Sequence, residues 1–301
     1  MNKTAVRLLV LCGVLLLSGC DSERLKEFSS LAAAGSAYAA VFPSFAAQLG
    51  SAQITINNDQ AVIAHANPID PATAKHNIRQ QDADLKAYLS TLDRLNAQAA
   101  LLGAYFDAMA QLANSKNTDQ IVTSANGLIA QINKVNDSVA QSKLSNSPTA
   151  KSIEDLVGQA AGLVVTHFQV KALDNNLEAN AKTIDRALAL QEAAIRAMQL
   201  QFSLALAGDD AFREETQVIS PYVSTKDLPK SWASDRTAYI QSSVSMASAD
   251  AAEAAITKLR VAFQEVVQNK GSQVDFNGIL DAIGKMAGYA NDVKTAISSS
   301  R

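Results

Sequence analysis

The polar side chains best placed to do chemistry interrupt one long apolar stripe. From Ile153 to Phe202 its residues are spaced three or four apart, and His167, Asp174 and Gln191 lie on it. A histidine and a carboxylate two helical turns apart can form a buried site or a proton relay. Buried polar residues in long helical seams more commonly fix the register of the packed helices. We therefore expect a structural role for these three residues.

An acidic cluster follows this stripe, formed by Asp209, Asp210, Glu214 and Glu215. Paired carboxylates can act in general acid–base catalysis or bind a hard cation. The cluster lacks the alternating oxygen ligands and the glycine of a calcium loop. Acids at the start of a helix also stabilise its dipole. We therefore predict a short helix over residues 209–215 and no metal site.

Other catalytic patterns are missing from the sequence. The three histidines, His65, His76 and His167, include no pair with zinc-ligand spacing such as H-x-x-x-H. His65 and His76 flank a proline-containing loop, which indicates surface positions. The chain has no G-x-S-x-G, G-x-x-x-x-G-K-[ST] or G-x-G-x-x-G motif. These observations predict a protein that is not an enzyme and that needs no cofactor or metal.

The clearest chemical signal is a cysteine near the N-terminus. Lys3 and Arg7 form a basic head, Leu8–Leu17 is almost purely apolar, and two small residues precede Cys20. This order is typical of a secretory signal peptide. The apolar run is about half of the roughly 20 residues that a membrane-spanning helix needs. Residues 1–19 are therefore predicted to be a signal peptide, and residues 20–301 a single domain.

The segment Leu17-Ser18-Gly19-Cys20 resembles the lipobox of bacterial lipoproteins. The resemblance implies that Cys20 is acylated and becomes the first residue of the mature chain. Asp21 resembles the inner-membrane retention signal of enteric bacteria. A membrane anchor facing the periplasm is thus expected, with the inner membrane favoured over the outer. More than one acyl chain would hold firmly, because each buried CH₂ contributes about 0.8 kcal/mol. Beyond this class, no family is recognised for the mature domain.

Charge and composition exclude several functions. Removing residues 1–19 takes away two of the 26 basic residues and none of the 29 acidic ones, which leaves a net charge of −5. Such a chain has no basic footprint for nucleic acid. With Cys12 in the signal and Cys20 acylated, no disulfide can form. Aromatic residues are only 5% of the chain, too few for the walls of a typical ligand pocket.

Periodicity predicts an all-α fold, an elongated antiparallel bundle of about six helices. The expected breaks are a kink at Pro43, a start at Asp70-Pro71 and a stop at Gly208-Asp209. Small residues at 32–35 should let two helices pack closely. The helices are expected at about 22–49, 71–113, 118–143, 148–207, 230–268 and 276–297.

Two segments depart from the helical pattern. Residues 53–63 alternate around Asn57-Asn58-Asp59, as in a small hairpin. Residues 216–224, around Pro221 and Tyr222, also read as extended. We predict short extended segments there, and we regard both as hypothetical contact points for a partner.

These features favour a lipid-anchored scaffold or adaptor that presents a long helical surface to an envelope protein. An immunity or exclusion lipoprotein acting against a toxin, phage or plasmid is an alternative. A third alternative is a cell-wall enzyme or a periplasmic ligand binder. Such ligand binders usually alternate strands and helices, and the sequence shows no such alternation, which counts against this alternative. The protein partner is unknown, and the stripes fit a monomer or a homo-oligomer equally.

Overall fold

The computed structural model describes residues 3–66, 70–114, 118–142, 152–153, 173–224, 227–245, 250–268 and 273–299. Within these ranges no strand occurs, which confirms the predicted all-α class. The elements are α1 Lys3–Ala66, α2 Pro71–Asn114, α3 Thr118–Ala140, α5 Leu173–Arg213, the π-helix η1 Glu214–Ile219, α6 Ser220–Ser224, α7 Trp232–Ser245, α8 Asp250–Val267 and α9 Phe276–Ser299.

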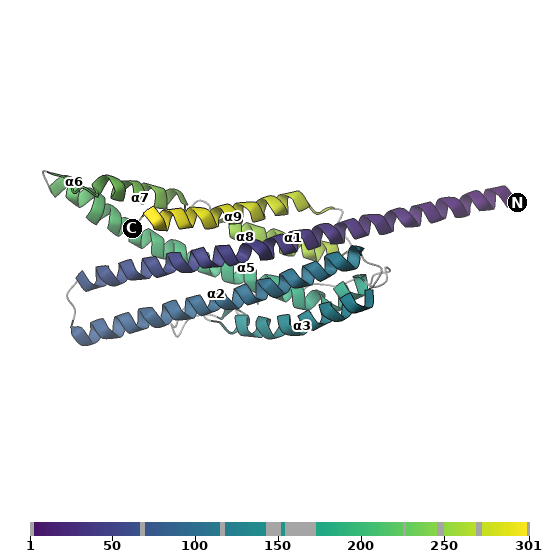
Figure 1. The fold of residues 1–301 in the computed structure, drawn as a ribbon, viewed down its shortest axis with the longest axis horizontal. Helices are drawn as coiled ribbons and strands as arrows, with labels where there is room; N and C mark the ends of the chain where they lie inside the picture. The colour runs from purple at the N-terminus through teal and green to yellow at the C-terminus, as the bar shows by residue number, and fades with distance from the viewer. Residues whose placement is uncertain are drawn as a thin grey trace.

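Six of the described helices form an elongated bundle (Figure 1). Helices α1, α2, α3, α5, α8 and α9 follow one another in a ring, because each packs on the next and α9 returns to α1. Helix α7 packs on α9 and η1 near one end. The N-terminal part of α1 extends well beyond its neighbours at the opposite end. The two ends of the bundle therefore differ. One end lies beside the N-terminal segment of α1, and the other end lies far from it.

Helix α1 supplies much of the core. Its aromatic residues Tyr38, Phe42 and Phe45 are fully buried, with ring centroids 5.7 and 6.0 Å apart in succession. Each large apolar side chain removed from water contributes about 1.5–3 kcal/mol. Among the described residues, Glu23–Val62 is the stretch long and apolar enough to cross a membrane. In its most apolar window 44% of the residues are buried inside the bundle.

The contact between α1 and α2 depends on small residues, as predicted from residues 32–35. A Cβ atom on Gly35 would lie 2.2 Å from the ring of Phe106, and one on Gly103 would lie 2.7 Å from the Cβ of Ala39. Both distances are far below van der Waals contact. The two glycines therefore let the helices approach more closely than any other residue would allow.

Helix α2 begins where the sequence indicated. The Asp70 carboxylate accepts hydrogen bonds from the backbone N–H groups of Ala72 and Thr73, both at 3.0 Å. Pro71 occupies the first helical position, where a missing N–H costs nothing. Hydrogen bonds from the side chain and backbone of Thr73 lower the pKa of the Asp70 carboxyl group. This cap confirms the predicted start.

The predicted hairpin over residues 53–63 is wrong, because α1 continues through Pro43 and past Leu49 to Ala66. The alternation of Ile54 and Ile56 suggested a strand, but the buried residues follow a helical spacing. Leu49, Ala52 and Ile56 are buried at steps of three and four, while Ile54 is exposed. Burying that stripe against α2 outweighs the local turn preference of Asn57-Asn58-Asp59.

The predicted stop at Gly208-Asp209 is also wrong. Helix α5 runs through it to Arg213, and residues 214–224 continue as η1 and α6 instead of an extended segment. The separate short helix predicted over 209–215 is therefore part of this longer helical run. A glycine inside a helix costs only about 0.5–1 kcal/mol, which does not end a long helix.

Several predicted stripes are confirmed. In α3, Ala125, Ile132 and Val139 are fully buried, and in α9 Ile279, Ile283 and Met286 face the core. The long helix was predicted over residues 148–207. Of these, residues 148–172 lie outside the described residues, apart from Ser152 and Ile153. The segment predicted over 230–268 forms two helices, α7 and α8. Both pack on α9 and α5, while α7 also packs on η1 and α8 on α1. The stripe of α5 is buried from position 177 onward, at Leu177, Ala181, Ile184, Leu188, Gln191, Ile195 and Met198.

Candidate interaction surface

Exposed large apolar side chains gather at the end of the bundle far from the N-terminus. Between positions 212 and 228 there are five of them, and the most exposed are Tyr222 at 64% and Val223 at 76%. We call this end, residues 211–232, the distal tip. Large exposed apolar patches on proteins often mark interaction sites. The five residues are Phe212, Ile219, Tyr222, Val223 and Leu228.

A widened helical turn shapes the distal tip. In η1 the Ser220 N–H donates to the carbonyl oxygen of Glu215, five residues earlier. Pro221 follows immediately, and a proline has no N–H for the carbonyl of Gln217 and clashes with it in a regular α-helix. The extra residue in the π-turn relieves this conflict, so the helical path can continue into α6. Such single π-turns recur at functional sites.

Trp232 holds the distal tip together. Its ring stacks on Tyr222, with centroids 5.6 Å apart, and its indole N–H donates to the Val218 carbonyl at 2.9 Å. The guanidinium group of Arg236 lies 6.0 Å from the centre of the Trp232 ring. Trp232 is the only tryptophan in the chain. The start of α7 is thereby fixed against η1 and α6, which keeps the apolar side chains exposed on an ordered scaffold.

An ion pair ties the distal tip to α1. Arg213, the last residue of α5, donates to the carboxylate of Asp59. The described side chains of residues 57–64 of α1 and 70–80 of α2 are exposed or half-buried, and we call this helix pair the arm. Figure 1 shows the arm and α6 at the same end of the molecule. The two predicted contact segments, around Asn57 and around Tyr222, therefore lie at one end.

The N-terminus of the bundle is docked at the other end. Arg24 donates to the Val266 carbonyl at the end of α8, 2.7 Å away, and pairs with Glu27 at 2.9 Å. Its guanidinium group also lies 4.5 Å from the centre of the Phe28 ring. Only three residues separate Arg24 from Cys20. Cys20 and Asp21 belong to the N-terminal part of α1, and their side chains are outside the described residues.

Of the polar residues predicted on the long stripe, Gln191 is fully buried and structural. Its side-chain oxygen accepts from the Tyr38 hydroxyl at 2.5 Å, and its amide nitrogen donates to the Leu95 carbonyl at 3.2 Å. It therefore connects α5 with α1 and α2, as expected of a residue that fixes register. His167 lies outside the described residues, and Asp174 is described only as part of the backbone of α5.

The other predicted polar residues are distributed over α1, α2, α5 and η1. Asp209 and Asp210 belong to α5, whereas Glu214 and Glu215 belong to η1. His65 near the end of α1 and His76 in α2 are exposed, in agreement with the surface positions expected for them. Among the residues that the structure describes, no group of three or more histidine, cysteine, aspartate or glutamate side chains is arranged to hold a metal ion.

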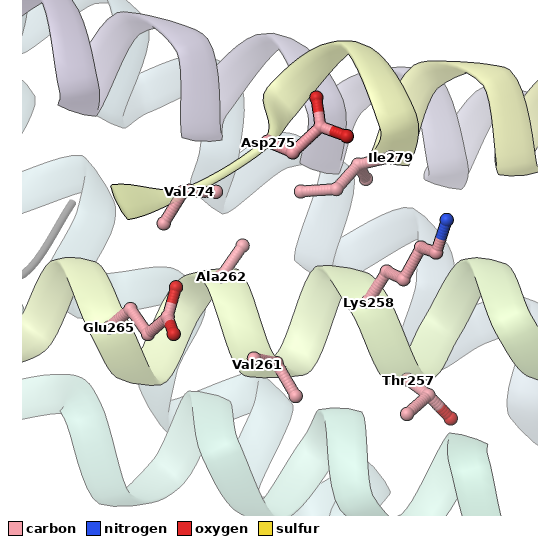
Figure 2. Close-up of a pocket in the computed structure, with 8 residues that line it drawn as sticks. All are labelled: Thr257, Lys258, Val261, Ala262, Glu265, Val274, Asp275 and Ile279. Atoms are coloured by element: carbon pink, nitrogen blue, oxygen red, sulfur yellow. The ribbon is translucent and has the colours of Figure 1, made fainter. Parts of the chain in front are cut away.

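A shallow groove lies between α8 and the start of α9, at the docked end of the bundle (Figure 2). Its volume is about 210 Å³, enough for one or two aliphatic side chains. Val261, Ala262, Val274 and Ile279 give it apolar walls. Lys258, whose ammonium donates to the Gly278 carbonyl, lies toward one side, with Glu265 toward the other. Thr257 and Asp275 complete the lining.

Neither a family model nor a curated protein nor a solved structure matches the chain. The surface must therefore be interpreted from its own chemistry. The groove between α8 and α9 presents no buried polar group, among the described residues that line it, for a small ligand to pair with. The distal tip presents the larger and more exposed apolar surface, which makes it the better candidate. The contact segment predicted over residues 216–224 included Ile219 and Tyr222 but missed Phe212 and Trp232, which only the helical path brings to the same end.

Proposed function

We propose that this protein is a lipid-anchored, non-enzymatic component of the cell envelope that presents its distal tip to a protein partner. The observation that carries the proposal is the concentration of exposed apolar residues at the end opposite the N-terminus. From Arg24 to Ala66, α1 rises about 60 Å at 1.5 Å per residue. An anchor at Cys20 would therefore hold the tip about that far from the membrane.

The docking of Arg24 supports this geometry. With Arg24 fixed on α8 and only three residues between it and Cys20, the anchor has almost no flexible tether. A short connection restricts how far the bundle can tilt or diffuse from the bilayer. A rigid rod that starts at the membrane is suited to placing a contact surface at a fixed height.

A protein partner fits the distal tip better than a second lipid surface. Residues 212–236 contain four basic and four acidic residues, so this segment has no net charge. Attraction to anionic bilayers depends on clusters of basic residues. An apolar centre with a mixed polar rim and a stacked aromatic pair is instead typical of protein interfaces.

Site-specific photo-crosslinking tests the proposal. A photoreactive amino acid is placed at Val223 on the tip or at Val261 in the groove, in the full-length chain expressed in its own cells. Val261 is 46% exposed and serves as the matched control. We expect a discrete protein adduct from position 223 and none of similar yield from 261. Equal yields at both positions, or an adduct from 261 alone, would contradict the proposal.

A further inference from the structure

The helical part of the distal tip, residues 214–224, adds nothing to the buried core. We call these residues, which make up η1 and α6, the tip segment. The structure describes all of them, and none is buried. The side chains of Thr216 and Ser224 donate to backbone carbonyls one turn earlier, so these hydrogen bonds stay within one helical path. Segments with few buried apolar contacts are the ones that open locally while the rest of a protein stays folded.

Trp232 connects both parts of the tip segment to the bundle. It begins α7, which packs on α9 and α5. Its indole N–H donates to the Val218 carbonyl of η1 at 2.9 Å. Its ring stacks on Tyr222 of α6, with centroids 5.6 Å apart. The Trp232 side chain is half-buried, so both contacts form near the surface and outside the apolar core.

Arg213 marks the point at which the tip segment begins. Its guanidinium group pairs with the Asp59 carboxylate, which holds the end of α5 against α1. The widened π-turn starts at the next residue, Glu214. The ion pair therefore lies on the bundle side of this boundary, and the contacts of Trp232 lie beyond it. A local opening that begins after Arg213 would break the contacts of Trp232 and leave the ion pair intact.

We propose that the tip segment opens as a unit while the bundle stays folded, and that Trp232 is the latch that keeps it closed. The closed segment presents Tyr222 and Val223 on an ordered backbone, and the open segment does not. The latch therefore sets the fraction of molecules that can bind, and the apparent dissociation constant rises as that fraction falls. The opening is a property of the free chain, whereas its effect on binding rests on the proposed function.

Hydrogen–deuterium exchange of the purified full-length chain in mild detergent tests the opening. We expect the amides of residues 214–224 to exchange on the order of a hundredfold faster than those of residues 184–198, in the buried part of α5. Low concentrations of urea should accelerate exchange in 184–198 and barely change it in 214–224, because a local opening exposes little new surface. Equal rates in the two segments, or an equal dependence on urea, overturn the proposal.

Three variants test the latch in the same measurement. Trp232→Ala removes both contacts and should speed exchange of residues 214–224 about tenfold, because a hydrogen bond and an aromatic pair are lost. Trp232→Phe keeps a ring for Tyr222 but has no N–H for Val218, so its exchange should be intermediate. Thr237→Ala, at an exposed position of α7, is the control and should exchange like wild type. Wild-type exchange in Trp232→Ala overturns the latch.

Photo-crosslinking in cells tests whether the latch controls binding. With the photoreactive amino acid at Val223, Trp232→Ala should lower the adduct yield severalfold, Trp232→Phe should lower it less, and Thr237→Ala should leave it unchanged. An undiminished yield in Trp232→Ala overturns the link between latch and binding. If position 223 of the wild-type chain yields no adduct above that from 261, the proposed function is wrong, whereas the exchange rates decide the opening and the latch separately.

Discussion

At the scale of single residues, polar side chains buried in the apolar core fix how the helices of the bundle align with one another. Burial raises the pKa of the Tyr38 hydroxyl well above its ordinary value, so the group stays neutral and donates to Gln191. A second bond, from Gln98 to Asn136 at 2.7 Å, joins α2 to α3, and Asn136 donates to the Thr183 carbonyl of α5. Each of these hydrogen bonds can form only when the helices that it joins are aligned in one register.

Replacing Gln191 by leucine is expected to lower the free energy of unfolding by about 1–3 kcal/mol. The Tyr38 hydroxyl would lose its buried acceptor, and leaving it unpaired costs more than the added apolar area returns. The Leu95 carbonyl, inside α2, would lose only its second hydrogen bond. Urea unfolding followed by circular dichroism measures the change. Gln131→Leu, at an exposed site on α3, is the control. A Gln191→Leu protein as stable as wild type would show that the bond does not contribute.

At the scale of helix pairs, small residues and ion pairs set the distances. Gly35 and Gly103 bring α1 against α2. Between α5 and α8, Arg260 binds Asp185 and Glu192, each at 3.0 Å. Burial lowers the pKa of Arg260, but hydrogen bonds and charge from the two carboxylates outweigh burial and raise it overall. The guanidinium group is therefore charged at all accessible pH values.

Gly35→Ala and Gly127→Ala should change stability in opposite directions. The Gly35 methyl would overlap the buried Phe106 ring, and such overpacking costs about 1–3 kcal/mol. A methyl group on Gly127 would meet no side chain or other helix within 4 Å in the described parts of the chain, so alanine there should stabilise α3 by about 0.5–1 kcal/mol. Thermal unfolding of both variants provides the comparison. A stabilising Gly35→Ala would refute the close approach of α1 and α2.

Arg260→Leu should destabilise the protein by about 2–4 kcal/mol, because it removes the guanidinium group that pairs with poorly exposed Asp185 and leaves Glu192 only its exposed cationic partner Arg196. Lys285→Ala, which breaks the exposed pair with Asp281, is the matched control, and no measurable change is expected there. Urea midpoints of the two variants distinguish the outcomes. Equal midpoints would mean that the α5–α8 network contributes no more than a surface ion pair.

At the scale of the whole molecule, the two ends differ in the contacts they can make. The N-terminal part of α1 protrudes beyond the bundle, and Arg24 fixes the chain just after Cys20. The apolar tip lies at the other end, beside the arm formed by α1 and α2. The long rise of α1 between them separates a proposed membrane anchor from a proposed protein contact.

Cys20→Ser should abolish fatty-acid labelling of the protein and release it from the membrane fraction, because acyl chains supply the anchoring free energy. Cys12→Ser should retain both properties, since that cysteine lies within the predicted signal peptide. Metabolic labelling with a clickable fatty acid, followed by membrane fractionation, measures them. Labelling that persists in Cys20→Ser would refute acylation at this residue.

Much of the helical fold was predictable because amphipathic periodicity reports directly on which face is buried. The stripes of α3, α5 and α9 and the cap at Asp70 follow from local spacing and local hydrogen bonds. The helical structure of residues 53–63 could not be predicted in this way, because their local turn preference competes with burial of Ile56 against another helix. Only the packed partner resolves that competition.

The sequence by itself determined the helical class, the lipobox-like segment and the absence of common catalytic motifs, since each depends on neighbouring residues. The tertiary structure decided that residues 216–224 are helical, that Gln191 reaches Tyr38, and that Phe212, Tyr222 and Trp232 share one end. These outcomes depend on helices distant in sequence. No local pattern specifies which side chains such contacts cover and which they leave exposed.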